Sequence, residues 1–209
     1  MSDLDRADKR QLRRRFLEER RALGEAERER TGRVLRSSLW AQPWTATTVA
    51  CYWSVDEEPD TRPLVNALWK RGVHVLLPVF LPGGELDWGA YEGPGSLEEA
   101  RYGLLEPTGH RHGTEAVAGV DLVVCPALAV DERGVRLGRG AGCYDRALSH
   151  KGPHTPVVVP LHEGELVEEL PAEEHDVPVD AVVTPGGLRV FDPDSPVWPA
   201  PPVQGDPRN

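Results

Sequence analysis

The chain has 209 residues, of which 39% are hydrophobic and 28% are charged, and its formal net charge is −10. This length suits one sizeable domain, and no run approaches the roughly 18 apolar residues of a membrane span. The acidic balance argues against general affinity for nucleic acid or an anionic membrane, and the N-terminus lacks a signal-peptide core, so we expect a cytoplasmic protein.

Two amphipathic helices are predicted to open the chain. Apolar residues recur at helical spacing among charges over 6–23 and again over 25–40. The first of these helices is strongly basic. Its arginines and lysine are open to two interpretations, a solvated helix face or a surface that binds an anionic ligand.

Predicted strands and helices alternate through the middle of the chain. A helix over 61–71 lies between strands at 48–53 and 73–79. Ser96 with Glu99 matches a capping box and predicts a short helix.

Three later apolar runs, 121–130, 155–160 and 180–184, lack alternation and predict strands that are buried on both faces. Such strands are typical of a mostly parallel or mixed sheet covered by helices on both faces, so we predict a single α/β domain over 1–191. The proline-rich segment 192–209 is predicted to be an irregular C-terminal extension.

The three cysteines are an odd number, which argues against a framework of disulfides. Cys51 and Cys125 lie within apolar runs, where a small reduced thiol packs well. We therefore expect buried, reduced core cysteines.

The most informative segment is 134–148, GVRLGRGAGCYDRAL, which joins a predicted strand to a predicted helix over 143–150. Glycines at alternate positions, Gly138, Gly140 and Gly142, let the backbone adopt positive φ and approach a ligand closely. Arg136 and Arg139 add charge that suits phosphate oxygens. The spacing matches neither a P-loop nor a dinucleotide motif, so composition alone leaves a phosphate-binding loop and a structural connector equally open.

Asp145 follows this loop directly. A carboxylate beside a phosphate site repels the ligand unless a divalent cation lies between them, and Mg²⁺ binds one or two carboxylates together with phosphate oxygens. An acid in the first turn of a helix also interacts favourably with the helix dipole. The residues alone leave these two interpretations even.

The run CPALAVDERGVRLGRGAGCYDRAL, 125–148, closely resembles the signature of the 5-formyltetrahydrofolate cyclo-ligase family, also called 5,10-methenyltetrahydrofolate synthetases. Further segments that agree with the family in order and spacing are 9–23, 51–61, 103–107 and 174–184. The resemblance implies conversion of 5-formyltetrahydrofolate to 5,10-methenyltetrahydrofolate with ATP and Mg²⁺, releasing ADP and phosphate. It also implies a fold related to the sugar-phosphate isomerase and CoA-transferase group.

The resemblance assigns roles position by position. The residues implied to bind ATP are Lys9, Arg13, Arg136, Gly138, Arg139, Gly140, Ala141, Gly142, Cys143 and Tyr144. Trp53, Glu58 and Tyr144 are implied to contact the folate, and Asp145 and Asp176 to hold Mg²⁺. Arg139 and Asp145 are implied to be catalytic. The partners expected are therefore 5-formyltetrahydrofolate and ATP, and the chain is expected to be a monomer or weak homodimer.

Two positions depart from the family pattern. Many members carry Lys or Gly where Ala141 stands and an aromatic residue where Cys143 stands. Cys143 is partly exposed and oxidation-sensitive under one interpretation, because thiols at helix N-termini have lowered pKa values. These departures leave open a non-catalytic folate- or nucleotide-binding relative. His175 is interpreted as positioning Asp176 or as exposed, rather than as a general base.

Overall fold

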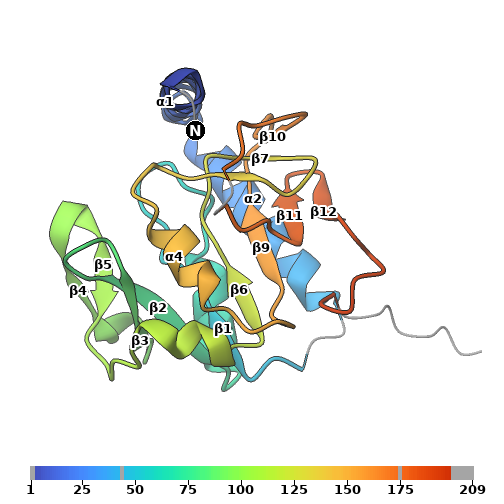
Figure 1. The fold of residues 1–209 in the computed structure, drawn as a ribbon. Coiled ribbons are helices and arrows are strands. Elements are labelled where there is room, and N and C mark those ends of the chain that lie inside the picture. Colours follow the sequence, from blue (N-terminus) through green and yellow to red (C-terminus); the bar gives the residue numbers. More distant parts are fainter. Residues whose placement is uncertain (1–2, 43–44, 174–175, 199–209) are drawn as a thin grey trace, which may run out of the picture.

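The computed structural model describes residues 3–42, 45–173 and 176–198, and within them seven strands form a central sheet (Figure 1). In spatial order the strands are β12 (Gly187–Val190), β11 (Ala181–Thr184), β9 (Val157–Pro160), β6 (Leu122–Val124), β1 (Thr48–Ala50), β2 (His74–Phe80) and β3 (Leu86–Ala90). The five inner strands are parallel, whereas β12 and β3 pair antiparallel at the two edges. The predicted α/β class with a mostly parallel sheet is confirmed.

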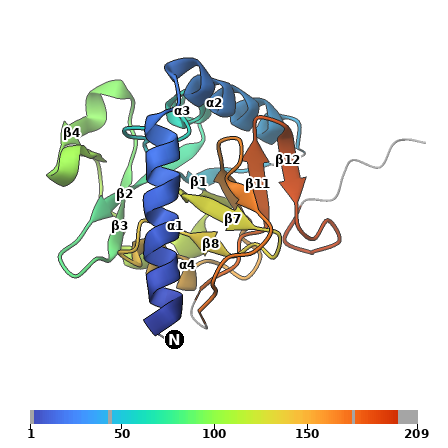
Figure 2. The ribbon, with the colours of Figure 1, turned by 90° about the horizontal axis from the view of Figure 1, so that it is seen from above.

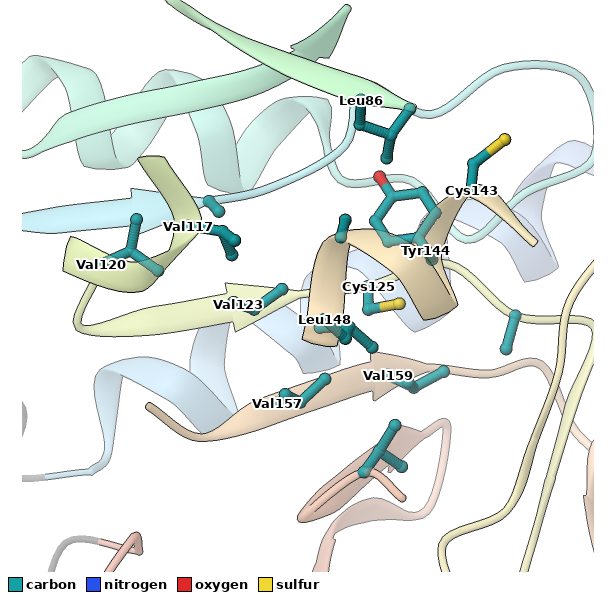
Figure 3. Packing of buried hydrophobic residues seen from close by; sticks show 14 of the residues in the cluster. Leu86, Val117, Val120, Val123, Cys125, Cys143, Tyr144, Leu148, Val157 and Val159 are labelled. Atoms are coloured by element: carbon teal, nitrogen blue, oxygen red, sulfur yellow. The ribbon is translucent and has the colours of Figure 1, made fainter. Parts of the chain in front are cut away.

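Helices cover both faces of this sheet. On one face α2 (Glu25–Trp40) and α3 (Arg62–Lys70) pack against the strands, and on the other lie α4 (Cys143–Ser149) and the 3₁₀ helix η3 (Thr114–Gly119). Successive strand residues therefore enter different hydrophobic clusters, because side chains alternate across a strand. In β6, Val123 packs toward α4 whereas Val124 packs toward α2. Figure 3 shows the α4 side of this arrangement, with Val123, Val157 and Leu148 close together.

Helix α1 (Asp3–Arg21) lies apart from these two layers. It packs against a small sheet of β10 (Leu166–Val167), β7 (Ala129–Asp131) and β8 (Arg136–Leu137), and Figure 2 shows it running beside β7 and β8. Phe16 anchors the helix in a third cluster with Leu128 and Leu137 and is 1% exposed. The basic helix is therefore held to the body of the protein along one apolar side.

The predicted helix at 96–99 is wrong. Ser96 ends a 3₁₀ turn, η1 (Pro94–Ser96), and its hydroxyl donates to the carbonyl of Gly93 at 2.8 Å instead of capping a longer helix. The residues that follow form β4 (Leu97–Glu99), which pairs with β5 (Leu105–Pro107) after a second 3₁₀ turn, η2 (Arg101–Gly103). Antiparallel pairing with the next strand, five residues further along the chain, overrides the capping pattern.

The predicted strand 121–130 is two strands. Pro126 lacks an N–H for the ladder, and the chain leaves the central sheet after Cys125, whose N–H still donates to the carbonyl of Val158. Residues 126–128 then turn into β7 of the small sheet. The bend places this segment at the edge of the site described below.

The described part of the proline-rich segment ends at a buried tryptophan. Trp198 is 7% exposed and packs into the α2 cluster, so the proline-rich segment lies against the domain as far as this residue. Residues 199–209 of the predicted extension lie outside the described part of the chain.

Cys51 and Cys125 are free thiols in the core, as predicted. No helix among the described residues is long and apolar enough to cross a membrane.

Candidate active site

A cavity of about 880 Å³ opens at the carboxyl ends of β1, β2 and β6. After β1 the chain leads to β2 on one side, whereas β6, on the other side of β1, comes later in the chain. In open α/β sheets the crevice at such a reversal is the usual position of a ligand site. Residues after β1 line the cavity, among them Trp53 and Glu58, as do Pro126, Ala127 and Leu128 after β6. Helix α1 also contributes to the lining, through Lys9, Arg10, Arg13 and Arg20.

The glycine-rich loop between β8 and α4 forms one wall. Gly140 and Gly142 have φ values of +103° and +67°, a conformation that favours glycine. Gly138 has no such need, but its carbonyl accepts a hydrogen bond from Arg13 Nε at 2.9 Å. This contact holds α1 against the loop, so a basic side chain of the first helix lies beside backbone that can approach a ligand closely.

Three cations of the cavity, Lys9, Arg136 and Arg139, pair with acids of the same cavity. Lys9 Nζ lies 2.8 Å from Glu173 Oε1 and 3.1 Å from Asp176 Oδ2. Arg136 forms an ion pair with Asp145. These pairs join α1 to the segment before β11, and β8 to α4, across the space where a ligand would lie.

The cavity lining contains as many cationic as acidic side chains. The cations are Lys9, Arg10, Arg13, Arg20, Arg136 and Arg139. The acids are Asp56, Glu58, Glu106, Asp145, Glu173 and Asp176. A cavity with six of each does not attract an anion by net charge alone, so a polyphosphate needs a cation to offset the carboxylates.

Two buried polar atoms of the lining lack a hydrogen-bond partner among the described residues, Arg136 Nε and the Tyr144 hydroxyl. Buried donors are almost always satisfied, and an exception in a cavity points to a missing ligand or water. Burial alone would lower the pKa of the Arg136 guanidinium, but nearby acidic groups, with Cys125 and Asp145 foremost, raise it. Arg136 is therefore a fixed cation with an unused donor.

The segment after β1 contributes Trp53 and Glu58 to the cavity. The Trp53 ring is half-buried and lies 5.5 Å from the Tyr91 ring, centroid to centroid. Burial raises the pKa of the Glu58 carboxyl, although Arg139 at 3.5 Å and the Val55 N–H oppose the shift. Glu58 therefore takes up a proton more readily than an exposed glutamate, and it can either donate or accept a hydrogen bond.

All fourteen site residues that the sequence analysis named line this one cavity. The expectation that Cys143 is partly exposed is wrong, since it is 8% exposed and packs in the α4 cluster (Figure 3). His175 lies outside the described residues. Sequence reasoning missed Glu173, which pairs with Lys9, and the apolar rim of Phe80 and Leu105, which are 38% and 37% exposed.

Only some of the missed residues carry a signal in the sequence. Leu105 and Glu106 belong to the GLLEP segment that the resemblance singled out, and both line the cavity. Phe80 directly follows the predicted strand 73–79, and the carboxyl ends of parallel strands are where ligand contacts gather. Glu173 stands in an acidic run with nothing local to distinguish it.

Replacing Gly140 by alanine is expected to lower the free energy of unfolding by about 1–3 kcal/mol, because an L-residue is strained at φ +103°. The added Cβ would also lie 3.2 Å from Cζ of Arg13 and displace its guanidinium. Chemical denaturation measures the loss. Gly95→Ala is the matched control, since Gly95 has open space and no positive φ. Equal stability of the two variants would contradict the strain argument.

The fold and cavity define a class, the α/β proteins that bind ligands at the switch point of a largely parallel sheet, here with a glycine-rich loop suited to an anion. The model of the 5-formyltetrahydrofolate cyclo-ligase family matches residues 5–185. A 5-formyltetrahydrofolate cyclo-ligase of Mycolicibacterium smegmatis is 41% identical over 185 residues, covering 85% of this chain and 93% of the relative. One of Escherichia coli K12 is 37% identical over 171 residues, covering 79% and 94%.

Solved structures agree with these relatives. The 5,10-methenyltetrahydrofolate synthetase of Aquifex aeolicus superposes with a TM-score of 0.76 at 32% identity, covering 90% of this chain and 95% of that one. The 5,10-methenyltetrahydrofolate synthetase of Mycoplasma pneumoniae, at 20% identity and a TM-score of 0.66, supports the fold. The chain belongs to the 5-formyltetrahydrofolate cyclo-ligase family. It is therefore an enzyme, a ligase of folate metabolism.

Proposed function

We propose that the chain uses ATP and Mg²⁺ to cyclise 5-formyltetrahydrofolate to 5,10-methenyltetrahydrofolate, with release of ADP and phosphate. The observation that carries the proposal is that one cavity holds two different environments. Its glycine-rich loop, cations and carboxylates suit a polyphosphate, whereas Trp53, Glu58 and the apolar rim suit a flat, partly polar ring. Two ligands of those kinds must meet for this reaction.

The triphosphate of ATP is assigned to the glycine-rich loop. Backbone at Gly140 and Gly142 approaches it closely, and Arg13, Arg136 and Arg139 supply charge from two sides. The Arg136 Nε donor would find its acceptor in a phosphate oxygen. Lys9 would exchange part of its contact with Glu173 and Asp176 for phosphate, which keeps its charge paired throughout.

Asp145 and Asp176 fit a magnesium ion. No cluster of three or more metal-ligating side chains occurs among the described residues, but Mg²⁺ characteristically takes only one or two protein carboxylates with phosphate and water. When bound there, Mg²⁺ would offset charge on the transferring phosphoryl group. The excess of carboxylates beside a phosphate site then has a physical reason.

The folate is assigned to the Trp53 end. The pterin would stack on Trp53, and Glu58, with its raised pKa, would bond the polar edge of the ring. Phe80 and Leu105 offer apolar surface to the remainder of the ligand. Arg139 pairs with Glu58 from the loop, so it lies between the two ligand environments.

The chemistry requires alignment and charge neutralisation from the protein. The formyl oxygen of the substrate attacks the γ-phosphorus, and the bond to ADP breaks. N10 of the substrate then attacks the activated carbon and loses its proton, and the carbon–oxygen bond breaks to release phosphate. Arg136 and Arg139 offset charge as the phosphoryl group moves, and binding of both ligands in one cavity holds the reacting atoms together. No protein nucleophile takes part.

The test is a turnover assay with 5-formyltetrahydrofolate, ATP and Mg²⁺. We expect the ultraviolet band of the methenyl product to appear together with one ADP for each product, because phosphoryl transfer precedes ring closure. Omitting ATP, or chelating the metal, should abolish both signals. A folded sample that binds ATP and yet forms no product would contradict the proposal.

A further inference from the structure

A buried ion pair lies at the wall of the cavity, where Arg20 contributes to the lining. Arg20 of α1 and Glu165 of the segment between β9 and β10 are 2% and 4% exposed. Arg20 donates from Nε and Nη2 to the two oxygens of Glu165 at 2.6 and 2.8 Å, and from Nη2 to the carbonyl of Ala127 at 2.6 Å. Three segments distant in the sequence are thereby fixed to one another.

His162 extends this pair toward the cavity. It is fully buried, and its backbone N–H donates to Glu165 Oε2 at 2.8 Å. Its ring lies between α2 and the loop after β1, with Nδ1 3.2 Å from Thr31 Oγ1 and Nε2 3.0 Å from the carbonyl of Glu57. A carbonyl only accepts hydrogen bonds, so Nε2 carries the proton and Nδ1 accepts from the Thr31 hydroxyl.

Glu57 belongs to the loop that presents Glu58. Its neighbour Asp56 is the one described non-glycine residue with positive φ, at +49°. The loop closes as a turn in which the Glu58 N–H donates to the Val55 carbonyl at 3.1 Å. Such a backbone conformation persists only where its surroundings enforce it. The bond from His162 to the middle of the turn supplies that enforcement from the protein interior.

We propose that His162 is a positioning residue for the folate end of the site. Held by Glu165 and Thr31, it fixes the Glu57 carbonyl and through it the placement of Glu58. The inference rests on the proposed function, since it concerns the folate that Glu58 contacts. It also predicts a larger effect on folate than on ATP, because His162 bonds the turn directly, whereas the glycine-rich loop assigned to ATP reaches the turn through the pair of Arg139 with Glu58.

Two isosteric variants test this role. In His162→Gln the side-chain amide can take the place of Nε2 and donate to the Glu57 carbonyl. In His162→Asn the amide can take the place of Nδ1 and keep the Thr31 contact, but it cannot reach Glu57. We expect the Asn variant to raise KM for 5-formyltetrahydrofolate about tenfold, the scale of one lost hydrogen bond, while KM for ATP stays within about twofold. The Gln variant should restore most of the loss.

A double-mutant cycle with Glu58→Gln completes the test. If His162 acts through Glu58, the two effects on KM for folate are less than additive. Equal changes in both KM values, identical Asn and Gln variants, or full additivity would overturn the positioning role. If the Asn variant fails to fold, Thr31→Val replaces it, with a smaller rise confined to the folate KM as the expected result and an unchanged KM as the contrary one.

The proposed function and this inference fail in different ways. Absence of turnover in the wild-type protein counts against the function. Normal wild-type turnover with an unchanged folate KM in His162→Asn counts only against the role of His162.

Discussion

Replacing Glu165 by alanine is expected to lower the free energy of unfolding by about 3–5 kcal/mol, because Arg20 would remain buried without its counterion. The same change removes the acceptor of the His162 N–H. Burying a charge and a donor without partners is far more costly than losing an exposed ion pair. Denaturant unfolding followed by circular dichroism measures the loss.

Two controls make the result specific. Glu163→Ala, two residues away and exposed, should change stability by no more than about 0.5 kcal/mol. The double replacement Arg20→Met with Glu165→Leu removes both charges and should recover much of the loss, since apolar pairs of similar volume often replace buried ion pairs without cost. A loss below about 1 kcal/mol in Glu165→Ala would show that Arg20 finds water or another partner.

The first helix illustrates why sequence alone left two interpretations open. Its basic residues look alike in the sequence, yet in the structure some of their side chains are exposed and others are buried. Arg14 is exposed and pairs with Glu18 one turn along, a solvated surface contact. Lys9 and Arg20 are 6% and 2% exposed and pair with acids more than 140 positions away. Nothing within a local window distinguishes the two kinds, because the partners come from the other end of the chain.

The glycine-rich segment shows the opposite case. Its glycines, arginines and Asp145 lie within ten residues, so their association could be predicted without knowledge of the fold. Their local placement also agrees with the prediction, since Gly140 and Gly142 take positive φ and α4 begins directly afterwards. The local sequence largely determines the geometry of a short motif. His162 and Thr31, by contrast, are 131 positions apart and are brought together by the packing of the fold.

The secondary-structure predictions likewise succeeded where a local pattern determined the element and failed where it did not. Continuous apolar runs predicted the inner parallel strands, because strands buried on both faces need no alternation. The prediction failed at 96–99, where residues 97–99 pair with the neighbouring strand β5, and at Pro126, which lacks an N–H for the ladder. The two-residue strands β8 and β10 were beyond prediction, since so short a stretch has no periodicity.

Replacing Asp145 by alanine is expected to lower kcat at least 10²–10³-fold, the range seen when one group that stabilises transition-state charge is removed. The reason lies in the position of the carboxylate. Asp145 pairs with Arg136 and lines the same cavity as Asp176, so under the proposed function it would both orient the cation assigned to phosphate and hold the metal that offsets its own charge. Removing it disturbs both functions. The methenyl product's ultraviolet band gives the rate.

A binding measurement separates these two functions. Wild-type protein should bind ATP more tightly with Mg²⁺ than without it, because Asp145 and Asp176 would hold the metal, whose charge would offset the repulsion between carboxylates and phosphate. Asp145→Ala should lose most of that difference, whereas its affinity for metal-free ATP should rise, since a repelling carboxylate is gone and Arg136 is released. Asp194→Ala, at an exposed position outside the cavity lining, should leave rate and binding unchanged. Unchanged kcat in Asp145→Ala, or Mg²⁺ dependence equal to that of the wild type, would show that the carboxylate serves only the packing of Arg136.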